Sequence, residues 1–164
     1  MGDFLTAYAQ VQPEKLAVVD DRPGGTVLSL SFYELEERAN RLANVLASLG
    51  AAPGRKVVWC GQNSIGVVTL VNAARKVGVT AVPLNYRLAP DEAAYVTDHS
   101  DAFLVCTDAE QAPMFASIRG ELPSVQHLLV YDGPAPEGMQ SVEALTAGAS
   151  TEPPPEVEPG RMSR

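Results

Sequence analysis

The chain has 164 residues with a net charge of −8, of which 46% are hydrophobic and 20% are charged, and this composition suits one globular domain with a real core. Its longest apolar stretch, IGVVTLVNAA, is about half of a membrane span, and the acidic start MGDF is unlike a secretory signal. Since Cys60 and Cys106 both lie in apolar runs, we expect buried free thiols in a cytoplasmic protein rather than a disulfide framework.

The amino-terminal part predicts a hairpin followed by a helix. LAVVD and TVLSL flank DRPGG, and Pro and Gly suit a tight reversal between two strands. The next stretch begins with a capping box of Ser31 and Glu34. Apolar residues then recur at steps of three and four until Gly50, which predicts a helix over 31–50.

After residue 50, strand patterns and helix patterns alternate. We predict strands within 55–61, 79–85, 101–108 and 124–133, and helices within 63–78, 90–100 and 109–122. This order predicts an α/β fold with a mostly parallel sheet and helices on both faces, preceded by the β-hairpin.

The composition changes after Gly133, where proline becomes frequent. We therefore assign residues 1–133 to one α/β domain and residues 134–164 to an extended, mobile linker rich in Pro and Glu. The linker contains one predicted element, a short helix in SVEALTAGA at 141–149.

The charge is unevenly distributed. No Asp or Glu occurs from Arg38 to Arg87, whereas this stretch carries seven of the twelve basic residues. Such a stretch suggests a positive surface for a phosphate-bearing ligand or an anionic membrane. The alternative is a set of scattered solvated charges, in which Arg75 and Lys76 simply close a helix whose dipole favours cations. The candidates for an anion-binding surface are Arg38, Arg41, Arg55 and Lys56.

Several kinds of site have no support in the sequence. Neither standard glycine-rich phosphate loop is present, and His99 and His127 stand without other metal ligands nearby. Ser64 follows a strand but lacks the flanking glycines of a nucleophile elbow, so a helix N-cap is favoured. Basic residues are not interleaved with aromatic ones, which argues against a nucleic-acid partner. We therefore predict no catalytic residue and no metal site in this chain.

Position in the sheet still suggests ligand contacts. Ligands of open parallel sheets gather at the carboxyl ends of the strands. At these ends Asn63, Asn85 and Arg87 offer amides and a permanent cation. The alternative is that Asn85 bonds the local backbone in a turn and that Arg87 pairs with Asp91 or Glu92.

Two stretches resemble conserved motifs of the adenylate-forming (AMP-binding) enzymes. LSFYELEERANRLANVLASLG (30–50) resembles the first core motif, and AARKVGVTAVPLNYRL (73–88) resembles the second. The spacer between them also fits, except that Arg55 stands where an Asp is common. The resemblance covers about residues 14–132. VPLNYRL followed by DEAAYVTDHSDAFLVCTD is most similar to the amino-terminal subdomain of a fatty-acyl-CoA synthetase.

The resemblance implies a reaction in which a carboxylic acid attacks ATP, assisted by Mg²⁺, to give an acyl-adenylate that is passed to coenzyme A. The partners of the parent enzyme would be a fatty acid or other carboxylic acid, ATP and CoA. The family's phosphate-binding loop and catalytic lysine are not in this chain, and we expect the loop just after RMSR at 161–164. The isolated chain is therefore expected to be inactive and to hold no cofactor.

Two further expectations accompany this interpretation. The basic stretch would attract the CoA phosphates or allow peripheral contact with a membrane. Uncovered apolar surface would favour a homodimer. Two alternatives stay open, namely a stand-alone binding or dimerisation module without catalysis, and an unrelated doubly wound nucleotide-binding domain.

Overall fold

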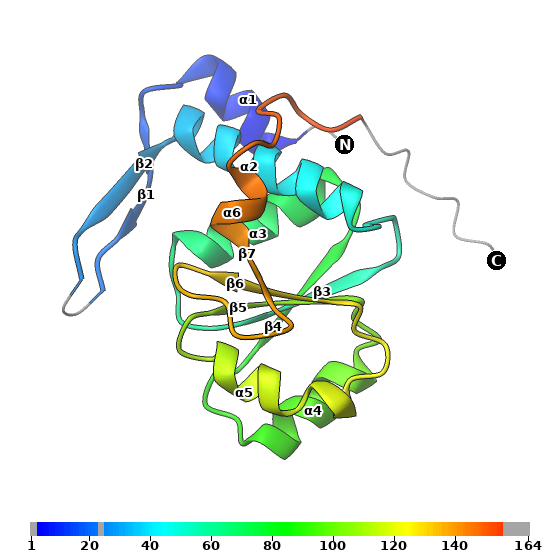
Figure 1. The fold of residues 1–164 in the computed structure, drawn as a ribbon. Coiled ribbons are helices and arrows are strands. Elements are labelled where there is room, and N and C mark those ends of the chain that lie inside the picture. Colours follow the sequence, from blue (N-terminus) through cyan, green and yellow to red (C-terminus); the bar gives the residue numbers. More distant parts are fainter. Residues whose placement is uncertain (1–2, 23–24, 156–164) are drawn as a thin grey trace.

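A computed structural model describes residues 3–22 and 25–155, and it shows one α/β domain with a hairpin at its side (Figure 1). The elements, in chain order, are α1 (Phe4–Val11), β1 (Leu16–Asp20), β2 (Leu28–Ser31), α2 (Phe32–Ser48), β3 (Lys56–Cys60), α3 (Ile65–Lys76), β4 (Thr80–Leu84), α4 (Pro90–His99), β5 (Leu104–Asp108), α5 (Ala112–Ser117), the 3₁₀ helix η1 (Arg119–Glu121), β6 (His127–Tyr131), β7 (Gln140–Ser141) and α6 (Val142–Thr146).

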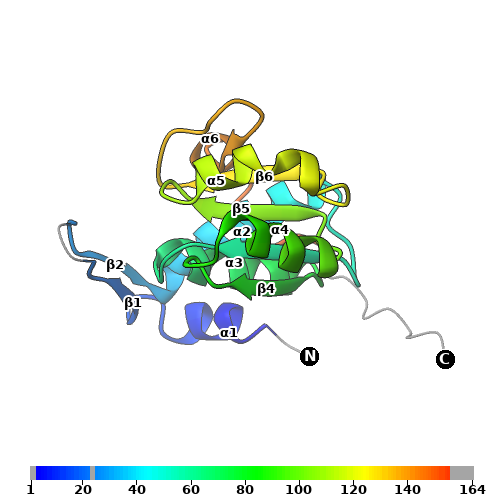
Figure 2. The same ribbon diagram turned by 90° about the horizontal axis from the view of Figure 1, so that it is seen from below.

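The main sheet has five strands in the order β4-β3-β5-β6-β7, and every neighbouring pair is parallel. Helices α2, α3 and α6 lie on one face, and α4 and α5 cover the other (Figures 1 and 2). Alternate residues of the central strands point to opposite faces, as the pleat requires. Val57 and Trp59 of β3 therefore pack on the α2 and α3 side, whereas Val58 and Cys60 pack under α4 and α5.

The predicted α/β class is confirmed, and local chemistry explains the best-predicted elements. The capping box of α2 is present, since the Ser31 hydroxyl accepts from the Glu34 amide and the Glu34 carboxylate accepts from the Ser31 amide. Ser64 caps α3 through a bond to the Gly66 amide, as the N-cap interpretation requires. Pro83 is tolerated because β4 is an edge strand of the sheet.

Two elements escaped the sequence analysis. Helix α1 begins where the Asp3 side chain accepts a hydrogen bond from the Leu5 amide. Strand β7 has only two residues, but it extends the parallel sheet beyond β6. Strands this short carry no alternating pattern that a sequence could reveal.

The segment after Gly133 is not extended throughout its described part, whereas its mobility stays a prediction. Strand β7 pairs with β6, and α6 is capped by Ser141 and packs near α2. Asn40 and Asn44 of α2 then donate to the backbone carbonyl oxygens of residues 150–152. The boundary at residue 133 and the approach to a phosphate-binding loop stay predictions, and RMSR lies outside the described residues.

Among the residues that the structure describes, no helix is both long and apolar enough to span a bilayer.

Candidate functional site

The carboxyl ends of β3 and β5 are joined by one buried carboxylate. Asp108 is 8% exposed, and its Oδ2 accepts from the Gln62 amide at 2.9 Å while its Oδ1 accepts from the Gln111 amide at 3.0 Å. The Gln62 side chain adds a hydrogen bond of 2.9 Å to Glu110. These bonds fix the loop after β3 against the loop after β5.

Gly61 makes this close approach possible. A Cβ atom at this position would lie 2.8 Å from Asp108 Oδ2 and 2.9 Å from Trp59 Cζ2. Any larger residue would therefore push the two loops apart. The requirement comes from lack of space, since no positive φ is recorded for Gly61.

The structure brings the predicted loop residues to one edge of the sheet. Asn63 is exposed in the loop after β3, and Asn85 and Arg87 are exposed in the loop after β4, which pairs directly with β3. Asn85 Oδ1 accepts from the Arg87 amide at 3.0 Å, so the local turn bond foreseen as the alternative is present. The Arg87 guanidinium lies 5.1 Å from the centre of the Tyr86 ring, and no described acid pairs with it.

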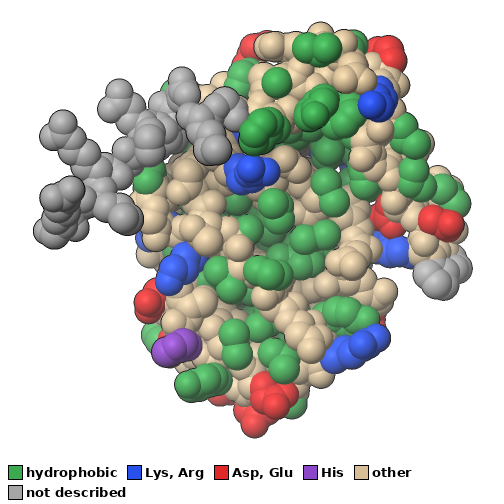
Figure 3. Space-filling view, turned by 180° about the vertical axis from the view of Figure 1, so that it is seen from behind, with side chains coloured by type: hydrophobic (Ala, Val, Ile, Leu, Met, Phe, Trp, Pro, Cys, Tyr) green, Lys and Arg blue, Asp and Glu red, His purple; other side chains and the backbone are tan. Residues whose placement is uncertain are grey.

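The four basic candidates do not form one surface. Arg38 and Arg41 lie on α2 and line a cleft. Arg55 and Lys56 lie at the opposite, amino-terminal end of β3, where Arg55 donates to the Gly50 carbonyl oxygen and stacks 4.4 Å over the Phe103 ring. The face seen in Figure 3 likewise carries separated basic side chains rather than a continuous basic patch.

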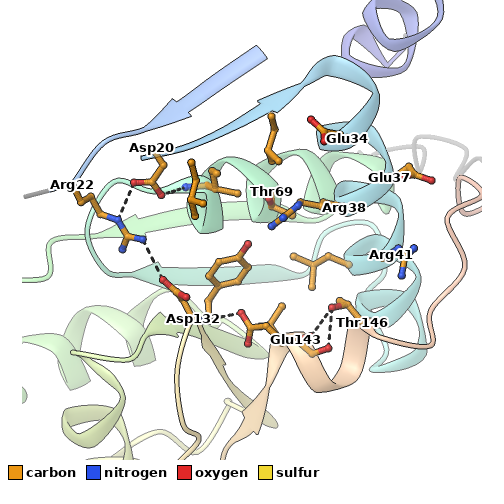
Figure 4. Close-up of a pocket in the computed structure, with 16 residues that line it drawn as sticks. Asp20, Arg22, Glu34, Glu37, Arg38, Arg41, Thr69, Asp132, Glu143 and Thr146 are labelled. Carbon is orange, nitrogen blue, oxygen red and sulfur yellow. Dashed lines mark hydrogen bonds and ion pairs between the residues drawn. The ribbon is translucent and has the colours of Figure 1, made fainter. Parts of the chain in front are cut away.

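The cleft beside α2 has a volume of about 470 Å³. Its walls come from the hairpin, α2, the start of α3, the end of β6 and α6 (Figure 4). Arg38 extends from α2 toward Thr69 of α3, whereas Arg41 lies further along α2. The cleft therefore combines segments that are far apart in the sequence.

One end of the cleft is closed by a chain of bonds that the sequence analysis missed. Asp20 accepts from the Ile65 amide at 2.9 Å, which holds the start of α3, and also from Arg22 at 2.9 Å. Arg22 donates in turn to Asp132 at 3.1 Å. The Asp132 amide donates to Glu143 at 2.7 Å. An acid at the end of a strand was the one available signal for this arrangement.

Tyr131 lines the cleft and lies against Gly66 of α3. A Cβ atom on Gly66 would lie 2.8 Å from Tyr131 Cδ1, so glycine allows the ring to rest on α3. Burial raises the pKa of Tyr131, while the neighbouring Arg38 acts in the opposite direction. The phenol is therefore neutral at ordinary pH and can donate a hydrogen bond.

Lys76 is not a free cation at a helix end, as its position in the sequence had allowed. Its side chain is 4% exposed, and Nζ lies 2.9 Å from Glu36 Oε1 and 2.9 Å from Thr6 Oγ1. It also contacts the Asp3 carboxylate. Burial would raise the pKa of Asp3, but the hydrogen bond and charge of Lys76 outweigh burial, so that this pKa is lowered. We call Asp3, Thr6, Glu36 and Lys76 the Lys76 cluster.

Neither cysteine has the environment of a reactive thiol. Cys60 and Cys106 are buried and unpaired. Burial, with a smaller contribution from Asp108, raises the pKa of Cys60 to about 12, and burial also raises the pKa of Cys106. Within residues 3–22 and 25–155, no group of three His, Cys, Asp or Glu side chains is arranged to hold a metal ion.

A parallel sheet with helices on both faces and polar loops at its carboxyl edge defines an open-sheet α/β domain, a class in which ligands bind at the carboxyl ends of the strands. The family model described as AMP-binding enzyme matches residues 5–162. The chain therefore belongs to the AMP-binding enzyme family.

Individual relatives agree with this assignment. The chain is 34% identical to a long-chain-fatty-acid–CoA ligase of Thermus thermophilus over 87% of its own length and 26% of that protein. It is 32% identical to a crotonobetaine/carnitine–CoA ligase of Escherichia coli O139:H28 over 84% of this chain and 27% of the relative. The crystal structure of the anthranilate CoA ligase AuaEII in complex with anthranoyl-AMP superimposes with a TM-score of 0.84 at 28% identity, over 95% of this chain and 29% of that one. The chain thus spans about a quarter of the length of the curated relatives.

Proposed function

We propose that this chain is the amino-terminal part of an ATP-dependent acid–CoA ligase. Such an enzyme joins a carboxylic acid to ATP, releases pyrophosphate, and passes the acyl group from the resulting acyl-adenylate to the thiol of coenzyme A. The observation that carries the proposal is the match to the AMP-binding family along residues 5–162. The relatives named above act on different acids, and we propose a fatty acid for this protein because of the first of them.

The proposed role of the carboxyl edge is to contact the substrates rather than to perform chemistry. Arg87 presents a permanent cation, and Asn63 presents an amide, on loops that follow adjacent strands. A guanidinium on a rigid loop suits a phosphate group, such as those of CoA or ATP. Asp108 supports these contacts because it holds the loop after β3 in place.

The described residues do not fit a Mg²⁺ site. Both Asp108 oxygens already accept amide protons, and no suitable group of acids exists among residues 3–22 and 25–155. The described part of the chain therefore supplies no set of ligands that would hold Mg²⁺.

The test is an activity and binding experiment on the 164-residue chain. We expect no ATP–pyrophosphate exchange with a panel of fatty acids, and turnover would contradict this. We expect CoA to shift NMR amide signals of residues 61–64 and 85–88, and Arg87→Gln to weaken binding several-fold through loss of a charge-assisted bond. Arg55→Gln is the matched control. Shifts confined to other residues would contradict the proposed CoA contact.

A non-catalytic binding or dimerisation module is the second candidate. Helix α1 favours it, since Phe4, Tyr8 and Val11 are 59%, 47% and 76% exposed and recur at the spacing of one helix face. An exposed apolar stripe of this kind suits a second copy of the chain. Light scattering should then give a dimer that Tyr8→Glu dissociates, and a monomeric wild type would contradict the homodimer.

Cytoplasmic location and peripheral membrane contact stay proposals. Because Arg38 and Arg41 lie apart from Arg55 and Lys56, membrane binding would have to use one pair. Co-sedimentation with vesicles containing anionic lipid, compared between charge reversals of the two pairs, identifies the pair. Equal binding by both reversed variants and the wild type would contradict membrane contact through these residues.

A further inference from the structure

The acids that line the cleft are already engaged. Each accepts a hydrogen bond from a donor within the chain, and Arg22 is bonded to two of them. These acids are Asp20, Glu34, Glu37, Asp132 and Glu143. Arg22 pairs with Asp20 and Asp132, whereas Glu34, Glu37 and Glu143 accept only from neutral donors and keep their negative charge.

The two arginines of α2 have no such partner. Arg38 and Arg41 form no ion pair with any residue that the structure describes. They are three positions apart in α2, so both lie on the helix face that borders the cleft. A guanidinium without a partner offers several N–H donors to an incoming oxyanion.

A buried hydroxyl faces the same space. Thr69 is 3% exposed and lines the cleft, and its Oγ1 has no hydrogen-bond partner among the described residues. A buried polar atom normally has a partner, because leaving it without one costs free energy. Arg38 extends toward Thr69, and both side chains lie close enough to Tyr131 to act against the rise of its pKa. The two donors therefore converge on one place, beside the Tyr131 hydroxyl.

The remaining walls are apolar. They are formed by Leu28, Leu30, Leu42, Ile65 and Val142. Leu28 is 48% exposed although it faces the cleft, so a ligand there would remove apolar surface from water. A cleft of about 470 Å³ has the size of a small-molecule site.

We propose that this cleft binds a small organic anion. Its oxyanion would contact Arg38 and Thr69, and its apolar body would lie against the apolar side chains named above. Carboxylates and phosphate monoesters share the required chemistry. The inference does not rest on the proposed function, because the cleft uses none of Asn63, Asn85 and Arg87. A flat anionic surface fits less well, since Thr69 is deeply buried at the back of a concave site.

The test uses the 164-residue chain and three probes: phenylbutyrate, phenyl phosphate and the neutral phenylbutanamide. We expect at least one of the two anions to shift NMR signals of residues around Thr69 and Tyr131. Its affinity should fall as the ionic strength rises. The better of the two identifies a carboxylate or a phosphate site. The neutral amide should bind at least tenfold more weakly, in line with the loss of a charge-assisted bond.

Matched variants locate the anion. Arg38→Gln should lower the affinity about tenfold and Thr69→Val about threefold, because the first removes a charged donor and the second a neutral one. Arg55→Gln removes an arginine of the opposite edge and should change nothing. The proposal is overturned if the amide binds as well as the anions, if Arg38→Gln and Arg55→Gln behave alike, or if neither anion binds at about 10 mM, a very weak affinity. Arg38 is exposed, so its variant is expected to fold, which circular dichroism checks.

Discussion

Helix α2 carries two polar regions of opposite character. Toward α1 and α3, Glu36 is 8% exposed and forms part of the Lys76 cluster, in which the cation is shared by two acids and a hydroxyl. Toward the hairpin and α6, Arg38 is exposed and forms no ion pair with a described acid, although Glu34 and Glu37 line the same cleft. The difference shows that a basic residue in a stretch without acids can be either buried in ion pairs, like Lys76, or exposed without an ion pair, like Arg38. The partners of Lys76 come from outside that stretch.

The strongest way to break this comparison is to remove the buried cation. Lys76→Met should lower the free energy of unfolding by about 3–5 kcal/mol, because Asp3 and Glu36 would be left near one another without a counter-charge. Urea denaturation measures the loss. Arg75→Met, at the exposed neighbouring position, should cost less than about 0.5 kcal/mol. Similar losses in both variants would show that the cluster contributes nothing special.

The cleft that Arg38 borders can be disturbed by a substitution in α3, at Gly66. Gly66→Ala places a Cβ atom 2.8 Å from Tyr131 Cδ1 and 3.0 Å from Trp59 Cη2, so the back of the cleft must shift. We expect a loss of about 1–3 kcal/mol, the usual cost of overpacking. Gly120→Ala is the control, since a Cβ atom at that position would meet nothing within 4 Å. Thermal denaturation that leaves both variants equal to the wild type would contradict the tight contact.

Low pH should destabilise the Lys76 cluster. The pKa of Asp3 is lowered in the folded state, so its contribution to stability is present above the ordinary value of 3.8 and is lost as the pH falls through the folded value. Asp3→Asn keeps a capping side chain but removes the charge. We expect this substitution to lower the free energy of unfolding by only about 1 kcal/mol at pH 7, since the carboxylate is partly exposed. The loss should be smaller at pH 3, because the wild-type carboxylate then begins to lose its own charge. A cost that is independent of pH would assign the effect to helix capping alone.

The smallest effect is expected at the two cysteines. With the pKa of Cys60 raised to about 12 by burial, almost no thiolate exists at pH 8, and Cys106 is equally enclosed. A thiol reagent should leave both unlabelled in the native protein and label both in urea. Rapid labelling of the native protein would show that the domain opens readily around β3 or β5.

Local signals made most of the fold predictable. The capping box at Ser31 and Glu34 and the alternation of helix and strand patterns correspond to what is observed. The sequence analysis missed α1, whose Asp3 N-cap was available as a signal, and β7, which is too short for any pattern. Helix α6 was foreseen, but its packing against the domain depends on tertiary contacts that no local pattern contains.

The candidate sites were predictable to a lesser degree. The alternation of strands and helices was enough to place Asn63 and Asn85 at the carboxyl ends of strands, but it did not reveal that these two strands are neighbours. The partners of Lys76 could not be foreseen, because Asp3 is 73 positions away and the contact exists only after α1 packs. Thr69 and Tyr131 look like ordinary core residues in the sequence. Only the structure shows that both line a cleft and so are candidates for contact with a ligand.

The bonds from Asn40 and Asn44 to residues 150–152 have an evolutionary consequence. Both side chains bind carbonyl oxygens of the main chain, which every amino acid possesses. The path of this segment along α2 is therefore set largely by the helix, and among its own side chains only the Ser150 hydroxyl adds a bond, from the Glu152 amide. Substitutions should accumulate at Thr151 and Glu152 far more readily than at the two asparagines that hold them.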